Sequence, residues 1–83
     1  MVIPSNISRE HVLEAINEID RNGVREGRES RVWFLIYNGR KYPPKYVISL
    51  ANKYINGKPL NPLDFTAHEA VAYLKKLKCS CRG

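Results

Sequence analysis

Two consecutive prolines, Pro43 and Pro44, constrain the fold of this chain more than any other feature. Proline cannot extend a β-ladder, so a strand that precedes the pair must end at Tyr42. Proline is favoured in the first turn of a helix, where N–H groups lack partners anyway, so a helix is predicted to begin here. Because two prolines remove two N–H donors that normally bind an anion at a helix start, we expect a carbon-covered positive helix end. Such a surface suits a soft, weakly hydrated anion better than a phosphate oxygen.

Regular elements are predicted on the N-terminal side of this junction. A helix should begin after Ser8, a favoured N-cap residue, and run to about Asn22, where a glycine follows. Residues 32–37 predict a strand, and the Asn-Gly pair after them is a strong hairpin signal, with 40–42 as the returning strand. Both faces of the first strand are apolar, so we expect helices to cover at least one of them.

Two more helices are predicted on the C-terminal side. One should span about 44–56, and its buried stripe is expected to be Val47, Ile48, Ala51, Tyr54 and Ile55. Residues 58–65 are rich in helix breakers and predict an irregular connector. Thr66 and Glu69 predict a capping box at the start of the last helix. The fold class is therefore α+β, a single domain over residues 1–83 with the order α-β-β-α-α.

The charge of the chain is positive and unevenly placed. The formal net charge is +6, and residues 21–58 carry nine arginines and lysines against only two acidic residues. A positive field of this kind favours polyanionic partners. No apolar run approaches the about 20 residues needed to span a bilayer, and no signal peptide is visible. We expect a cytoplasmic protein with no membrane partner.

Catalytic and metal-binding chemistry is poorly supported. The carboxylates lie mainly on the predicted outer face of the first helix, and no glycine-rich phosphate loop is present. Cys79 and Cys81 are expected to be free thiols in a frayed tail, since a zinc site needs about four ligands and only two distant histidines are available. The sequence therefore predicts no catalytic residues, no metal site and no cofactor.

Nucleic-acid binding is better supported, because cations and tyrosines alternate around the proline pair. The candidates are Arg25, Arg28, Arg31, Arg40, Lys41, Lys45 and Lys53, interleaved with Tyr37, Tyr42 and Tyr46. Phosphate contacts by arginine and lysine supply affinity without sequence information. Purely structural roles remain open at this point: the tyrosines as half-buried core, and the prolines as a rigid helix start.

The block Arg40-Lys41-Tyr42-Pro43-Pro44-Lys45-Tyr46-Val47, with Asn56-Gly57-Lys58-Pro59-Leu60 and Phe65 after it, resembles the sulfur-binding domain of type IV restriction endonucleases. Those proteins recognise DNA whose backbone carries a phosphorothioate. The resemblance extends over nearly the whole chain. It implies a non-catalytic recognition domain, which in full-length relatives accompanies an HNH nuclease domain that these 83 residues do not supply.

The resemblance also implies roles for individual residues. A nonpolar cavity for the sulfur would be lined by Tyr42, Pro43 and Tyr46, where Tyr46 departs from the small residue common in relatives. Pro44 and Lys45 complete the motif, and the basic contacts to the backbone would be Arg9, Arg28 and Arg31. Where relatives have a Ser-Gly-Gly-like turn, this chain has Thr66-Ala67-His68, which implies a contact from His68.

The resulting hypothesis is a module that binds phosphorothioated double-stranded DNA and that has a nuclease domain or subunit as its other partner. Three alternatives remain. A general nucleic-acid binder would use the tyrosines as stacking platforms and would be indifferent to sulfur. A protein-interaction adaptor would bind no DNA at moderate salt. An enzyme would need a catalytic domain outside these residues.

Overall fold

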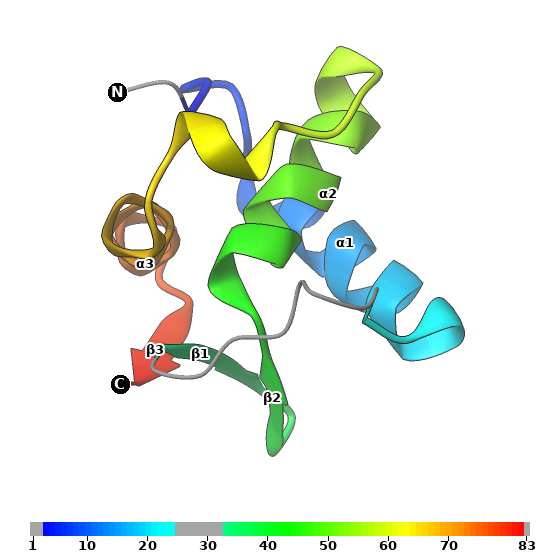
Figure 1. The fold of residues 1–83 in the computed structure, drawn as a ribbon. Coiled ribbons are helices and arrows are strands. Elements are labelled where there is room, and N and C mark those ends of the chain that lie inside the picture. Colours follow the sequence, from blue (N-terminus) through cyan, green and yellow to red (C-terminus); the bar gives the residue numbers. More distant parts are fainter. Residues whose placement is uncertain (1–2, 25–32, 83) are drawn as a thin grey trace.

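A computed structural model of the chain describes residues 3–24 and 33–82, and its fold is shown in Figure 1. The elements are helix α1 (Arg9–Asn22), strands β1 (Phe34–Tyr37) and β2 (Arg40–Tyr42), helix α2 (Pro44–Asn56), the 3-10 turn η1 (Pro62–Asp64), helix α3 (Ala67–Lys76) and strand β3 (Ser80–Arg82). The predicted α-β-β-α-α order is confirmed. Two short elements, η1 and β3, were not predicted.

Helix α1 has the predicted bounds and begins with an unusual cap. The Ser8 N–H donates to Nδ1 of His11, 3.0 Å away, and the Ser8 hydroxyl lies 2.9 Å from the same nitrogen. His11, the third helical residue, therefore caps its own helix. The helix ends at Gly23, whose φ of +75° favours glycine. The apolar stripe of α1 is buried: Val12, Ala15, Ile16 and Ile19.

The sheet has three antiparallel strands in the order β2-β1-β3. The predicted Asn38-Gly39 turn joins β1 to β2, and both residues have positive φ, 50° and 77°. The prediction of a frayed tail was wrong, because residues 80–82 pair with β1 in the register Leu35↔Cys81. A strand of three residues is too short to show an alternating apolar pattern in the sequence. Its pairing depends instead on the edge of β1 that β2 leaves unpaired. Cys79 and Cys81 are half-buried free thiols, and burial raises the pKa of Cys81 to about 11.

Helix α2 is the central element, lying between α1 and α3 (Figure 1). Its first nine residues, 44–52, are all buried except Lys45. The predicted burial of Tyr54 and Ile55 was wrong: they are 37% and 36% exposed. The Tyr54 hydroxyl reaches Glu18 on α1 while its ring stays partly exposed, so a regular apolar stripe does not guarantee burial in the last turn. The following connector is tied back to α2, since the Ser49 hydroxyl donates to the Leu60 carbonyl at 2.7 Å.

Helix α3 begins with the predicted capping box. The Thr66 N–H donates to Oε1 of Glu69 at 2.9 Å, and the Glu69 N–H donates to Oγ1 of Thr66 at 3.2 Å. Tyr73, which was not predicted to be buried, is only 4% exposed, and its hydroxyl donates to the Ile7 carbonyl at 2.7 Å. This bond attaches the N-terminal segment to α3. Within residues 3–24 and 33–82, no helix is long and apolar enough to cross a membrane.

Candidate nucleic-acid interface

The proline pair occupies the start of α2 as predicted. Pro43 is the N-cap residue, with φ −68° and ψ 118°, and Pro44 is the first helical residue. The Pro43 carbonyl accepts the Val47 N–H at 3.0 Å, which is the first backbone hydrogen bond of the helix, and no side chain caps this end. Neither proline nitrogen carries a hydrogen, and the Pro43 side chain offers no acceptor. The N-cap and the first helical position therefore offer neither an N–H donor nor a side-chain acceptor.

The four rings of the motif are largely buried. Tyr42 is 3% exposed and Tyr46 is 6% exposed, and Pro43 and Pro44 are buried as well. The Tyr42 hydroxyl donates to Oδ1 of Asp20 on α1 at 2.7 Å. Burial, followed by this bond to a carboxylate, raises the pKa of Tyr42. Tyr42 thus serves as a core residue that joins β2 to α1.

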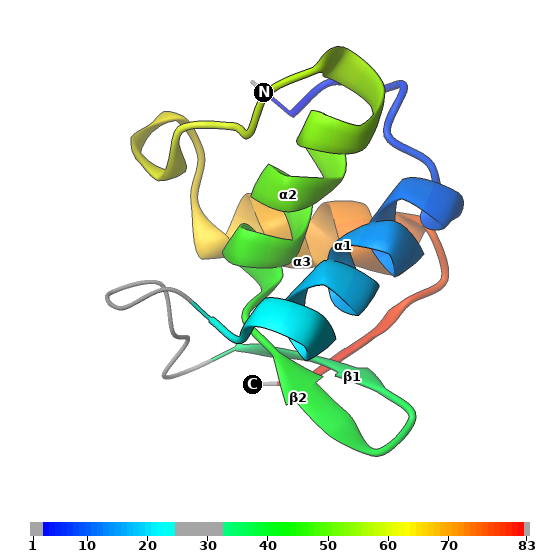
Figure 2. The same cartoon turned by 90° about the vertical axis from the view of Figure 1, so that its right-hand side faces the viewer.

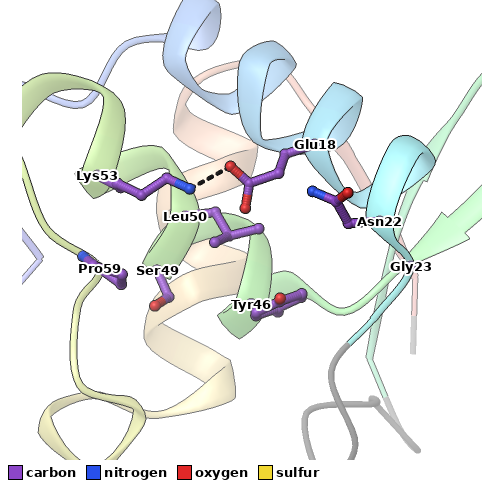
Figure 3. Close-up of a pocket in the computed structure, with 8 residues that line it drawn as sticks. All are labelled: Glu18, Asn22, Gly23, Tyr46, Ser49, Leu50, Lys53 and Pro59. Atoms are coloured by element: carbon purple, nitrogen blue, oxygen red, sulfur yellow. Dashed lines mark hydrogen bonds and ion pairs between the residues drawn. The ribbon is translucent and has the colours of Figure 1, made fainter.

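Tyr46 borders a hollow of about 350 Å³ between α1, α2 and the connector (Figure 3). Its lining residues are Glu18, Asn22, Gly23, Tyr46, Ser49, Leu50, Lys53 and Pro59. The exposed members, Asn22, Gly23 and Pro59, form the rim, while Ser49 and Leu50 are buried and form the floor. Of the predicted contacts, Tyr46 and Lys53 border this hollow.

An ion pair crosses one side of this hollow. The Lys53 ammonium donates to Oε1 of Glu18, and the Tyr54 hydroxyl donates to the same oxygen at 2.6 Å. The bond from Lys53 and then the bond from Tyr54 lower the pKa of Glu18, and the Glu18 carboxylate raises the pKa of Lys53. Lys53 was predicted as a DNA contact, and the structure shows that Glu18 already neutralises it. The carboxylates of α1 were predicted to lie mainly on its outer face, yet the Glu18 side chain is only 15% exposed.

Two predicted contacts lie near aromatic rings on one side of the domain. The Lys45 ammonium lies 5.2 Å from the centre of the Phe65 ring, in cation–π geometry. The His68 ring lies edge-on to Trp33, with 5.6 Å between the ring centres. Figure 2 shows that the starts of α2 and α3, which carry Lys45 and His68, lie close together on the left of that view. Two positive helix ends therefore meet on one side of the domain.

Arg9 lies elsewhere. It stands at the first position of α1, beside Lys78 and Cys79 around a separate hollow of about 150 Å³. Tyr42 contacts α1 at Asp20, eleven residues further on, which corresponds to about 16 Å along the helix axis. The predicted contacts Arg25, Arg28 and Arg31 lie outside the described residues.

Sequence reasoning missed two residues of this side. Lys75 on α3 places its ammonium 5.8 Å from the centre of the Trp33 ring, which also contacts His68. The spacing of His68 and Lys75, seven residues apart on one helix face, was the available signal. Among the described residues, no three His, Cys, Asp or Glu side chains gather in a way that would hold a metal ion.

Neither a curated protein nor a solved structure matches this chain. One family model does match, over residues 5–79, and it is described as "ScoMcrA-like, N-terminal head domain". The match includes α1, the hairpin, the Tyr-Pro-Pro-Lys motif and α3, and it confirms the resemblance to the recognition part of type IV restriction enzymes. Because the match covers nearly the whole chain, we conclude that this protein belongs to the family of ScoMcrA-like N-terminal head domains.

Proposed function

We propose that this domain binds duplex DNA that carries a backbone phosphorothioate, with the sulfur against the carbon surface at the start of α2. The observation that carries the proposal is the double-proline start itself, in which the N-cap and the first helical residue both lack an N–H. Membership in a family of type IV restriction-enzyme head domains supports DNA recognition as the setting. Tyr42, Pro43 and Tyr46 are the proposed sulfur contacts.

Sulfur and oxygen differ in how they tolerate such a surface. A phosphate oxygen held against proline and tyrosine carbons would lose hydration without gaining a hydrogen bond, which costs a few kcal/mol. Sulfur is larger and more polarisable and accepts hydrogen bonds weakly, so it loses less and gains dispersion contact. The preference therefore arises mainly because the site penalises oxygen.

Cations around this carbon surface would supply affinity for either backbone. Lys45 follows the prolines directly, and its position over Phe65 fixes its direction. His68 at the start of α3, and Arg28 and Arg31, are proposed as further phosphate contacts. Arg9 is proposed as a contact to a more distant part of the duplex, since it lies at the opposite end of α1 from Asp20.

A second candidate function is binding of duplex DNA without a sulfur preference. The burial of Tyr42 and Tyr46, at 3% and 6% exposure, favours this candidate, because little ring surface is open to a ligand. The same burial argues against both tyrosines as stacking platforms for single strands, since stacking requires an exposed ring face.

The variant Pro43→Ser tests the proposal. Serine is a preferred N-cap residue, so the helix should remain stable while the site regains an N–H and a hydroxyl. We expect wild type to bind a duplex with one sulfur at least about tenfold more tightly than the matched oxygen duplex, and Pro43→Ser to lose most of that ratio. Pro4→Ser, a half-buried proline outside the motif, is the matched control.

The measurement is a binding titration of both duplexes at two salt concentrations, with circular dichroism to verify folding. Equal affinity of the wild type for both duplexes would reject the sulfur preference and leave general DNA binding. Absence of binding to either duplex at low salt would reject both candidate functions.

A further inference from the structure

The hollow beside Tyr46 has the size of a small-molecule site. Its volume of about 350 Å³ lies at the lower end of the range of about 300–1,000 Å³ typical of ligand pockets. It adjoins the start of α2 through Tyr46, so it lies next to the proposed backbone contact (Figure 3). A Cβ placed on Gly23 would meet no atom of the described residues within 4 Å, so that part of the rim is open as far as residues 3–24 and 33–82 are concerned.

The charges in this hollow disfavour an anion. Glu18 points toward it, and its carboxylate is paired with Lys53 and bonded by the Tyr54 hydroxyl (Figure 3). The charges of Glu18 and Lys53 cancel, and a phosphate that entered would meet the carboxylate. The low pKa of Glu18 keeps this carboxylate ionised near neutral pH. The occupant that fits is therefore neutral.

The remaining lining residues suit a flat molecule with a polar edge. Pro59 is exposed and supplies most of the carbon surface, and Tyr46 and Leu50, which are 6% and 5% exposed, add only the edges that reach the hollow. Asn22 at the rim carries an amide, which can both donate and accept hydrogen bonds. The Ser49 hydroxyl donates to the Leu60 carbonyl and so keeps its own oxygen as an acceptor. A nucleobase has this combination of an apolar face and an edge of alternating donors and acceptors.

We propose that this hollow receives one nucleobase swung out of the duplex, next to the backbone position held at the start of α2. The inference rests on the proposed function, because a base is available only if the domain binds DNA. Tyr46 is the shared element: it borders the hollow and belongs to the Tyr-Pro-Pro-Lys-Tyr motif. Asn22 is the residue that would contact the edge of the base.

Duplexes with 2-aminopurine at successive positions around a single sulfur test this inference. Its fluorescence is quenched by stacking, so we expect a severalfold rise at one position when wild-type protein saturates the duplex. A mismatch at that position should tighten binding, because an unpaired base costs less to extrude.

The variant Asn22→Leu is expected to lose most of the fluorescence rise and to weaken binding by about fivefold, the equivalent of one ordinary hydrogen bond. Asn17→Leu is the matched control, since Asn17 is an exposed asparagine on the same helix that does not line the hollow. This control should match wild type in both measurements.

The outcomes separate the two proposals. Unchanged fluorescence at every position while the duplex is saturated would overturn the base site and leave the proposed DNA binding intact. A fluorescence rise that reaches half of its maximum at the same protein concentration for sulfur and oxygen duplexes would support the base site and contradict the sulfur preference. Absence of duplex binding would overturn both.

Discussion

Replacing Tyr42 with alanine is expected to destabilise the domain severely. The ring is 3% exposed, and truncating a buried aromatic residue to alanine costs about 3–5 kcal/mol. A domain of 83 residues has a free energy of unfolding of about 4–12 kcal/mol, from about 0.05–0.15 kcal/mol per residue. Tyr42→Ala should therefore lose a large share of the total stability. If the wild-type free energy of unfolding lies at the lower end of this range, the variant would be unfolded.

The variant Tyr42→Phe separates the contribution of the ring to stability from that of the hydroxyl. It keeps the packed ring and removes only the bond to Asp20, whose side chain is 37% exposed and can be hydrated instead. We expect a cost of about 0.5–1.5 kcal/mol. The phenylalanine ring presents similar carbon surface, so this variant should keep any sulfur preference of the wild type.

Urea titrations followed by the fluorescence of Trp33, the single tryptophan, provide the assay. With an m-value of about 1 kcal/mol/M for a domain of this size, the midpoint should fall by about 3 M or more for Tyr42→Ala. The midpoint for Tyr42→Phe should fall by about 1 M. If the free energy of unfolding of Tyr42→Ala lies within about 1 kcal/mol of the wild-type value, the ring does not belong to the core. The loss of sulfur preference in that stable variant would then identify Tyr42 as a surface contact.

Three further predictions concern other contacts. Tyr73→Phe should cost about 1–3 kcal/mol in urea unfolding, because it leaves the buried Ile7 carbonyl without its donor; a change below 0.3 kcal/mol would contradict the bond. The pKa of Glu18 is lowered on folding, so its contribution is present above its ordinary value of 4.5 and is lost as the pH falls through the lower folded value. The stability difference between wild type and Glu18→Gln should therefore shrink as urea titrations move from pH 7 to pH 3, and a constant difference would argue against the pair with Lys53. Thr66→Ala should cost about 1 kcal/mol through loss of the α3 cap, whereas Thr66→Ser should restore it in thermal unfolding.

Local sequence signals predicted the elements well where they act over a few residues. Proline cannot pair in a strand and starts helices, so the boundary at Pro43 was readable directly. The Asn38-Gly39 turn requires positive φ, and the Thr66 capping box satisfies helix donors within one turn. These rules depend on backbone geometry alone and need no knowledge of what lies across the core.

Local signals failed where distant parts of the chain decide. Strand β3 forms by pairing with the edge of β1 that β2 leaves open. Its three residues are too few to predict that pairing from the sequence. Tyr54 and Ile55 continue the apolar stripe of α2, but they stay 37% and 36% exposed because no element packs over them as the core packs over the earlier turns among the described residues. Tyr73 is buried because the Ile7 carbonyl lies beside it, 66 residues away in sequence.

The same division holds for the candidate site. The sequence by itself determined the double-proline helix start and the excess of cations around it, because composition and proline chemistry fix both. Only the tertiary structure decided that Tyr42 turns its hydroxyl to Asp20 and that Glu18 neutralises Lys53, since each bond joins residues from different elements. The hollow beside Tyr46 also exists only through packing, because three separate segments must meet to enclose it.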